Sequence, residues 1–357
     1  MDLYDKWKRR KMWQNILIVG IIVILVMLLS VFCLFLGIRH RGKEALEASG
    51  SCGQSETETQ LEESSSVLSY DGENYEYRKN LLTFLVLGID DYETVSPAVD
   101  GISGGQSDAM FLVVVDLDRE KISVIAINRN AMVTLDVYDR AGEYMYQWYG
   151  QITLQHGYGD GMEISCERTA RTVSRLFYQI PINGYFSVNM GAIGAINDAV
   201  GGVELVSMDD FYFPDFTPRE GETIRLEGMQ AYYYLKYRDI TVFESASERL
   251  ERQKQYLSAF AKQVLEKTKR NIAFPLKLYQ EIEPYVVTNL DSSEMIYLAS
   301  EVAGYDFDDV EILSVPGETV MGEQFEEFYI DEDAFYQMVL SVFYEKADEE
   351  IESLSEK

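Results

Sequence analysis

Cysteine, histidine and positive charge are scarce in this chain of 357 residues. Its three cysteines, Cys33, Cys52 and Cys166, are spaced too widely to indicate a disulfide framework or a metal motif. Its two histidines, His40 and His156, are too few and too far apart for a histidine-based triad or a zinc site. Lys and Arg number 31 against 60 Asp and Glu, and the net charge of −29 argues against nucleic acid as a partner. A cluster of basic side chains is informative against this background.

The longest apolar run extends from Ile16 to Ile38 and contains no charged residue. About 20 apolar residues in a helix span the roughly 30 Å hydrocarbon core of a bilayer. A cleaved signal peptide has a shorter apolar core, whereas this run is long and is followed by arginine at 39 and 41. Basic residues at positions 6 and 8–11 outnumber those behind the run, which favours a cytoplasmic N-terminus. We expect residues 1–15 in the cytoplasm, one transmembrane helix over 16–38, and an extracytoplasmic main domain held at the cell membrane.

Residues 39–79 predict an acidic, Ser/Thr-rich extracytoplasmic linker. From Glu44 to Tyr77 there are nine Asp or Glu and no Lys or Arg, so this segment lacks the composition of a packed core. A solvated stalk is the prediction, and a folded acidic subdomain is the alternative. The residues after 345 are again rich in Asp and Glu, so we predict one domain over 80–345 and an acidic tail over 346–357.

Strand and helix patterns alternate through the predicted domain. Leu81–Gly88 reads as a buried strand, and Ala109–Leu117 and Lys121–Ile127 flank a polar turn, as in an antiparallel hairpin. Helical spacing places apolar residues on one face from Cys166, itself predicted as core, to Phe177, and again from Leu250 to Val264. Further strands are expected at Tyr185–Asn189, Val203–Val206 and Val310–Val315, and further helices at Ala192–Val200, Gly228–Tyr237, Pro275–Ile282, Ser293–Val302 and Glu332–Tyr344. The mixture predicts an α/β fold, an αβα sandwich with a central mixed β-sheet.

Basic side chains gather at a few places in spite of the acidic composition. Arg129 ends a predicted strand, Lys236 and Arg238 end a predicted helix, and Arg249 and Arg252 share one face of the next helix. Guanidinium groups match phosphate oxygens in pairs, and lysine supplies a point charge. The set suits a pyrophosphate site. In the alternative reading, each residue pairs with a local carboxylate.

Asp108 stands between a glycine-rich loop and a predicted strand, where a carboxylate can reach a ligand or a Mg²⁺ ion. Magnesium in proteins commonly takes one or two carboxylates together with waters and phosphate oxygens. Bracing of the loop or capping of a helix is the alternative role. The loop, with Gly101, Gly104 and Gly105, matches no Walker or dinucleotide pattern.

Aromatic residues occur in three short groups. Such residues could line a pocket for a lipid tail, because ligand sites are mostly apolar with few polar groups, but more often they simply belong to a core. The groups are Tyr146, Trp148 and Tyr149, then Phe211, Tyr212 and Phe213, then Tyr232, Tyr233 and Tyr234.

Taken in order, six segments resemble the LytR-CpsA-Psr family of bacterial cell-wall proteins from about residue 80 to residue 343. Their order, their spacing and the preceding apolar run all agree with that family. The segments are LLTFLVLGID at 81–90, QSDAMFLVVVDLDREKISVIAINRNAMV at 106–133, IPINGYFSVNMGAIGAINDAVGGVELV at 180–206, LEGMQAYYYLKYR at 226–238, ERLERQKQYLSAF at 248–260 and SVPGE at 314–318.

The resemblance implies an αβα sandwich on one N-terminal anchor and a phosphotransferase activity. Such a protein moves a glycopolymer phosphate from a polyprenyl-pyrophosphate carrier to peptidoglycan, by positioning and charge neutralisation. Carried over to this chain, the resemblance implies Mg²⁺ at Asp108 and Asn130, and catalytic roles for Asp108, Arg129 and Arg238. It further implies pyrophosphate binding by Arg129, Lys236, Arg238, Arg249, Arg252 and Gln253.

The chain departs from the family pattern at the implied site. Gln106 replaces the arginine of Arg-Ser-Asp, Asn130 replaces the last residue of Pro-Arg-Asp, and Lys236 replaces the first residue of Arg-x-Arg. The aspartate expected three residues before Arg249 is Ala246. These changes remove two carboxylates and two guanidinium groups, although the charge at 236 is kept.

Three hypotheses follow from the sequence. The first is a membrane-anchored, Mg²⁺-dependent phosphotransferase that attaches a glycopolymer to the cell wall. The second is a catalytically weakened relative that binds lipid-linked or cell-wall ligands as a scaffold or regulator. The third is an unrelated interaction domain, for which the basic residues would not converge at one site.

Overall fold

The computed structural model describes residues 34–47, 67–213, 215–239, 241–306 and 310–347. The expected membrane helix over 16–38 lies outside these residues except for its last five, which belong to a helix over 34–47. Within the described ranges, no helix is both long enough and apolar enough to cross a bilayer. Residues 1–15, which were expected in the cytoplasm, and most of the predicted acidic tail also lie outside them.

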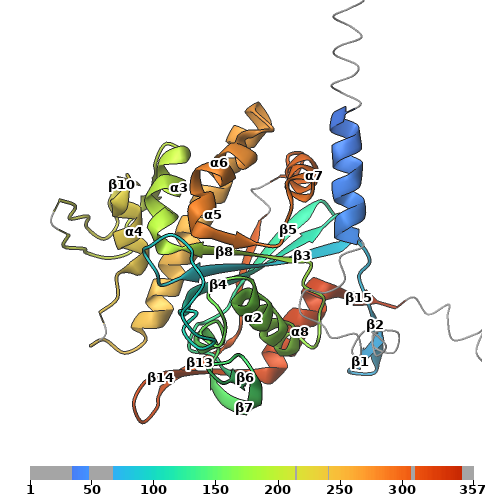
Figure 1. Ribbon diagram of the computed structural model, residues 1–357, viewed down its shortest axis with the longest axis horizontal. Helices are drawn as coiled ribbons and strands as arrows, with labels where there is room; N and C mark the ends of the chain where they lie inside the picture. The colour runs from blue at the N-terminus through green and yellow to red at the C-terminus, as the bar shows by residue number, and fades with distance from the viewer. Residues whose placement is uncertain (1–33, 48–66, 214, 240, 307–309, 348–357) are drawn as a thin grey trace, which may run out of the picture.

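A six-stranded mixed sheet forms the centre of the domain (Figure 1). The predicted hairpin is confirmed, because β3, β4 and β5 pair antiparallel in sequence order, while β8 joins β3 and β12 joins β5 in parallel. The strands, in spatial order, are β11 (Val286–Thr288), β8 (Gly184–Asn189), β3 (Leu81–Ile89), β4 (Ser107–Asp116), β5 (Lys121–Ala126) and β12 (Glu311–Ser314).

Helices cover both faces of this sheet, as predicted (Figure 1). Successive side chains of a strand point to opposite faces, so Leu85 and Leu87 of β3 enter one core, whereas Leu82 and Phe84 enter the other. One face packs against α2 (Glu163–Leu176) and α8 (Glu332–Phe343), and the other against α5 (Ser245–Arg270), α6 (Phe274–Ile282) and α7 (Ser292–Val302). Cys166 lies in the α2 core, fully buried, as expected.

A smaller lobe stands beside the sheet and contains the second aromatic group. It consists of α3 (Ile193–Ala199), β9 (Val203–Val206), β10 (Thr223–Leu226) and α4 (Met229–Lys236), which pack with α5 around one core cluster. The predicted strand Val203–Val206 is present, but it pairs with β10 rather than with the central sheet. The lobe holds the C-terminal end of α4 against the N-terminal half of α5.

Two outer hairpins were not predicted from the sequence. β6 (Met132–Tyr138) pairs with β7 (Tyr144–Gln151), and β13 (Gly317–Met321) pairs with β14 (Glu326–Ile330). They lie beneath the sheet in Figure 1, next to each other, and a bridge between Ala131 and Phe328 connects them. β7 lacks the alternation of buried and exposed residues that identifies a half-buried strand, because its first six residues are all exposed.

The expected linker is folded at both of its described ends, which corrects the prediction of a solvated stalk there. β1 (Val67–Tyr70) and β2 (Glu73–Tyr77) form a hairpin that pairs with β15 (Tyr344–Lys346) at the end of the domain. The composition concealed this hairpin because its packing depends on tyrosines, as in the contacts of Tyr70 with Tyr336 and of Tyr77 with Tyr344. Asp71-Gly72, both with positive φ, is a typical hairpin turn that the composition argument passed over.

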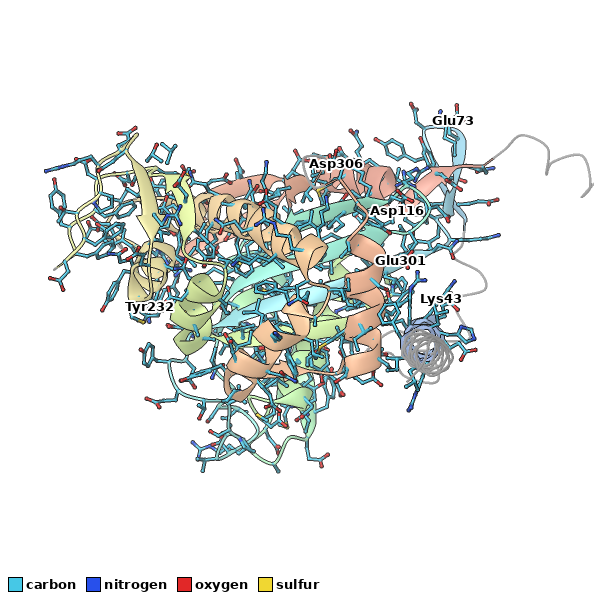
Figure 2. The ribbon with its side chains drawn as sticks, turned by 90° about the horizontal axis from the view of Figure 1, so that it is seen from above. Lys43, Glu73, Asp116, Tyr232, Glu301 and Asp306 are labelled. Atoms are coloured by element: carbon cyan, nitrogen blue, oxygen red, sulfur yellow. The ribbon has the colours of Figure 1, made fainter. Side chains whose placement is uncertain are left out.

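The helix over 34–47 packs against α7, and Figure 2 shows Lys43 and Glu301 on these neighbouring helices. Arg39 pairs with Glu301 at 2.7 Å, and Leu46 is 1% exposed in a cluster with Tyr297. Gly42 lies so close to the carbonyl oxygen of Ser293 that a Cβ there would meet it at 2.1 Å. The residues that directly follow the apolar run are therefore attached to the domain.

Candidate functional site

The candidate site lies at one end of the sheet, where β3 and β5 end and β4 begins. Ile89 of β3 pairs with Ser107 of β4, and Ala126 of β5 pairs with Phe111 of the same strand. Because β4 runs antiparallel to both neighbours, the residues that follow β3 and β5 reach the same edge as Asp108. The fold thus brings together residues that are far apart in sequence.

Asp108 is the centre of the site, and two arginines share its carboxylate. The side chain is 4% exposed, Nη1 of Arg249 donates to Oδ2 at 3.0 Å, and Arg129 forms an ion pair with Oδ1. Arg249 reaches this position from the second turn of α5, where its side chain is 6% exposed. One buried carboxylate facing two guanidinium groups leaves positive charge uncompensated at this point, which is unfavourable without an anionic ligand.

Arg129 shows the electrostatic consequence of this arrangement most directly. Burial lowers the pKa of Arg129, the positive charges of Arg249 and Arg238 lower it further, and Asp108 opposes the shift. Its Nη2 donates to Oε1 of Gln106 at 2.7 Å, but its Nε is buried and has no hydrogen-bond partner among the described residues. Buried donors are normally satisfied, so this N–H marks a place for an external acceptor.

Arg238 joins the site from the loop between α4 and α5. Its Nε donates to the hydroxyl of Ser245 at 2.9 Å, and its Nη2 donates to Oε2 of Glu326 at 2.7 Å.

Glu326, on β14, is 7% exposed and was not singled out in the sequence. It lies in an acidic stretch of an unpredicted hairpin, so no sequence signal separated it from its exposed neighbours.

Lys236 contacts the same edge from the end of α4. Its Nζ lies 2.7 Å from Oδ1 of Asp90, which directly follows β3, and this hydrogen bond raises the pKa of the lysine. The side chains of Lys236 and Asp90 are 42% and 41% exposed. The four basic residues considered so far pair with carboxylates distant in sequence, rather than with the local carboxylates of the alternative reading.

Arg252 and Gln253 hold the end of α4. Arg252 is 3% exposed and donates to the backbone carbonyls of Tyr234 and Tyr237, while Gln253 donates to the carbonyl of Leu235 at 3.5 Å. The last carbonyls of a helix lack partners within the helix, and these side chains supply them. In this structure the two residues therefore position the segment that carries the lysine and arginine of the site.

The predicted metal ligands are Asp108 and Asn130. Asn130 is 4% exposed, and its side-chain oxygen accepts from Gln151 at 3.4 Å. Among the described residues no group of three or more His, Cys, Asp or Glu side chains could hold a metal ion. Asp108 is the one carboxylate that the prediction offers, so the protein donors fit Mg²⁺ only together with the oxygens of a bound phosphate.

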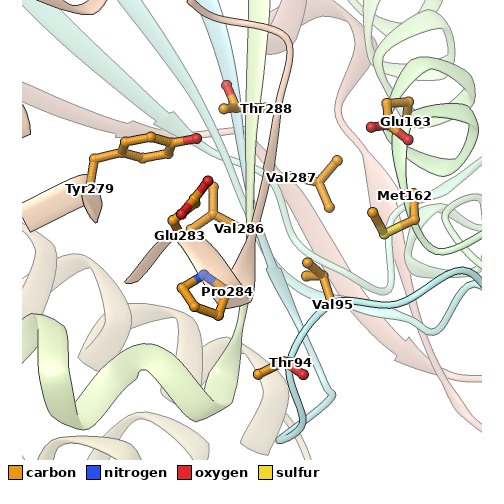
Figure 3. Close-up of a pocket in the computed structure, with 10 residues that line it drawn as sticks. All are labelled: Thr94, Val95, Met162, Glu163, Tyr279, Glu283, Pro284, Val286, Val287 and Thr288. Carbon is orange, nitrogen blue, oxygen red and sulfur yellow. The ribbon is translucent and has the colours of Figure 1, made fainter. Parts of the chain in front are cut away.

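The three aromatic groups do not gather around one cavity. Phe211, Phe213 and Tyr234 pack beside Arg252 in the small lobe, whereas the group on β7 is exposed. The pocket in Figure 3, of about 410 Å³, contains none of these groups and none of the basic site residues. It is lined by Thr94, Val95, Met162, Glu163, Tyr279, Glu283, Pro284, Val286, Val287 and Thr288. The candidate site is identified by its buried arginines, which share the carboxylate of Asp108, and this cavity contains none of them.

Comparison with known proteins agrees with the resemblance seen in the sequence. Residues 45–341 match the LytR_cpsA_psr family. The polyisoprenyl-teichoic acid–peptidoglycan teichoic acid transferase TagV of Bacillus subtilis (strain 168) is 25% identical over 269 residues. The match covers 72% of this chain and 62% of TagV, so the chain spans less than two thirds of that relative.

Solved structures share the mixed α/β fold. Protein gbs0355 of Streptococcus agalactiae has a TM-score of 0.58 and 18% identity, with 73% of this chain and 87% of that chain covered. A structure of TagT bound to LI-WTA has a TM-score of 0.54 and 20% identity, with coverage of 74% and 90%. At these identities the likeness establishes the fold alone.

Proposed function

Because the chain belongs to the LytR_cpsA_psr family and its buried arginines meet at one carboxylate, we propose that it is a membrane-anchored glycopolymer phosphotransferase. It transfers a glycopolymer phosphate from a polyprenyl-pyrophosphate carrier to peptidoglycan. The observation that carries the proposal is the sharing of Asp108 by Arg129 and Arg249, which prepares two guanidinium groups for a pyrophosphate. The match to TagV supports the class of reaction.

In the proposed reaction a hydroxyl oxygen of the acceptor attacks the phosphorus that carries the glycopolymer. A new P–O bond forms, the bond to the bridging oxygen of the pyrophosphate breaks, and polyprenyl phosphate leaves with the negative charge. The hydroxyl proton passes to solvent. Arg129, Arg238 and Arg249 bind the phosphate oxygens and neutralise the charge that shifts to the leaving group, which is the main requirement in phosphoryl transfer.

We also propose a Mg²⁺ ion that binds with the pyrophosphate. Asp108 and Asn130 would hold the ion through a carboxylate oxygen and an amide oxygen, together with oxygens of the bound phosphates. The ion would supply further neutralisation of phosphate charge. Arg252 and Gln253 act by holding the end of α4, and Lys236 adds a charge at the rim.

The membrane attachment remains part of the proposal. The proposed anchor over 16–38 shares its last five residues with the helix over 34–47, and the packing of that helix on α7 supports an attachment close to the domain. The domain would then lie outside the cytoplasm, close to the bilayer that holds the polyprenyl carrier.

A second candidate is a weakened relative that binds the same lipid-linked or wall ligands without turnover. The observation in its favour is the loss of carboxylates at Asn130 and Ala246, since Ala246 is buried at the start of α5. Binding by this candidate would not depend on a metal ion.

The test is a titration of the full chain, in detergent micelles, with a polyprenyl pyrophosphate. Arg238→Ala should weaken binding by about 1.5 to 3 kcal/mol, roughly tenfold or more, because one charge-assisted contact is lost. Mg²⁺ should strengthen binding to the native chain. Binding that is indifferent to Mg²⁺ supports the weakened relative, and binding that Arg238→Ala leaves unchanged contradicts the proposed site.

A further inference from the structure

Strand β7 presents a solvent-exposed aromatic surface. Tyr144, Met145, Tyr146, Trp148 and Tyr149 are each between 46% and 56% exposed, so that five of the first six residues of the strand are large and apolar. Exposed edge strands usually carry charged side chains, and a contiguous exposed apolar patch indicates an interaction surface. Within the described residues β7 pairs with β6 alone, which leaves its outer edge open.

This surface is continuous with the candidate site. Gln151 ends β7, and its Nε2 donates to the side chain of Asn130 at 3.4 Å and to the backbone carbonyl of Glu326 at 2.7 Å. Glu326 is the partner of Arg238. Trp148 stands three residues before Gln151, about 10 Å away at roughly 3.3 Å per residue. The aromatic strand therefore leads outward from the place where the phosphate would bind.

The surface has the features of a sugar-binding platform. The ring of Trp148 lies against Gly150, where an added Cβ would meet a ring carbon at 2.5 Å, and the side chain is still 46% exposed. A flat exposed ring stacks on the C–H face of a sugar. The hydroxyl of Tyr329 donates to Oε2 of Glu327 at 2.7 Å. Hydroxyl and carboxylate groups of this kind can also form hydrogen bonds with sugar hydroxyls.

Negative charge beside this aromatic surface favours an uncharged ligand over an anionic one. The pKa of Tyr149 is raised by burial and by Glu332 and Glu327, which places these two carboxylates close to the strand. A polymer with a phosphate in every repeat would be repelled there, whereas an uncharged glycan would not. The surface is also rich in aromatic rings rather than in the β-branched residues typical of a strand-to-strand contact.

We propose that β7 binds an uncharged glycan strand of the acceptor and presents its hydroxyl to the phosphate site. This inference rests on the proposed function for the identity of the glycan as the acceptor. The binding itself depends on residues that are separate from the arginine cluster, so the two can fail independently.

The experiment is co-sedimentation of the full chain, in detergent micelles, with peptidoglycan sacculi from which anionic glycopolymers have been removed. Trp148→Ala should weaken binding at least fivefold, and Trp148→Phe, which keeps a flat ring, should stay within about twofold of the native chain. Tyr212→Ala, an exposed aromatic change at 69% exposure in the small lobe, is the matched control and should leave binding unchanged. Thermal unfolding of each variant checks that the domain still folds.

Several outcomes would overturn the inference. Native-like binding by Trp148→Ala, binding only to sacculi that retain anionic polymer, or a change of oligomeric state in Trp148→Ala would each do so. Arg249→Ala should still bind the sacculi, because this arginine lies in the phosphate site. If the native chain fails to bind polyprenyl pyrophosphate but binds sacculi through Trp148, the proposed transfer is wrong and the glycan surface stands.

Discussion

The two ends of α5 hold arginines in opposite surroundings. Near the N-terminus, the side chain of Arg249 is 6% exposed and shares Asp108 with Arg129. Near the C-terminus, Arg270 is 81% exposed and lies 3.9 Å from Glu266. A cation at a helix C-terminus complements the helix dipole, whereas a buried cation near the N-terminus opposes it. Surroundings, rather than residue type, therefore distinguish a candidate phosphate-binding arginine from an ordinary surface arginine.

The largest expected effect follows from removing the shared carboxylate. Asp108→Asn should lower the free energy of unfolding by about 3 to 5 kcal/mol, because Arg129 and Arg249 would remain buried without the carboxylate that balances their charge. Added inorganic pyrophosphate should recover part of this loss. Urea denaturation measures both. Glu266→Gln at the other end of α5 is the control, and its free energy of unfolding should change by no more than about 0.5 kcal/mol. Equal losses of stability in the two variants would contradict the difference proposed between the two ends of α5.

A matched pair of arginine variants addresses binding. Arg249→Ala should weaken the binding of polyprenyl pyrophosphate by about 1.5 to 3 kcal/mol, because a charge-assisted hydrogen bond is lost. Arg270→Ala, at the exposed end of the same helix, should bind like the native chain. Calorimetric titration of both variants compares them directly. A similar loss in both would show that long-range charge, rather than contact, attracts the ligand.

His156 contacts the loop before Asp108, and the pH dependence of stability tests whether its ring is buried and neutral. His156 donates from Nδ1 to the carbonyl of Gly104 at 2.8 Å, and burial lowers the pKa of the ring to about 4. Between pH 6.5 and 4 the unfolded chain takes up a proton that the folded protein does not, so stability falls as pH falls through this window. At pH 5 the loss relative to pH 7 is about 2 kcal/mol.

His156→Asn keeps a donor for Gly104 and removes the titration. Its stability should therefore fall by about 2 kcal/mol less than that of the native chain between pH 7 and pH 5. Urea midpoints at the two pH values provide the measurement. Equal acid sensitivity in the two proteins would mean that the ring is protonated in the folded state.

The smallest effect is expected at the rim of the site. Lys236 and Asp90 are 42% and 41% exposed, and an exposed ion pair contributes no more than about 1 kcal/mol. Lys236→Ala should therefore weaken pyrophosphate binding less than Arg249→Ala does, and most of its effect should disappear at high salt. A titration at two ionic strengths tests this. A salt-independent loss as large as that of the buried arginine would place Lys236 inside the site.

The central sheet was predictable from the sequence because its strands are apolar on both faces and its helices keep a regular apolar face. The hairpin β1–β2 was not, since its packing depends on tyrosines and on partners far along the chain, such as Tyr344. The two outer hairpins were not either, because the first six residues of β7 are all exposed and β14 pairs with a distant part of the chain at Ala131. Local periodicity does not contain that information. The Asp-Gly turn at residues 71 and 72 was a local signal for β1–β2.

The site was predictable in part. The positions of Asp108, Arg129 and Arg249 at the ends of predicted elements allowed them to be grouped, and the fold brings them into contact. Glu326 and Asp90 were missed, because acidic residues are abundant in this chain and neither stands out. The contacts of Arg252 with α4 depend on how two helices cross, which sequence spacing does not determine.

The most direct test of the central claim is a transfer assay with the full chain in lipid vesicles. The vesicles contain a polyprenyl-pyrophosphate-linked glycopolymer with a labelled polymer, and sacculi are the acceptor. We predict covalent incorporation of label into the sacculi by the native chain, and incorporation at least tenfold slower with Arg249→Ala but not with Arg270→Ala. Tight binding of the carrier without any incorporation by the native chain would contradict the proposed transfer.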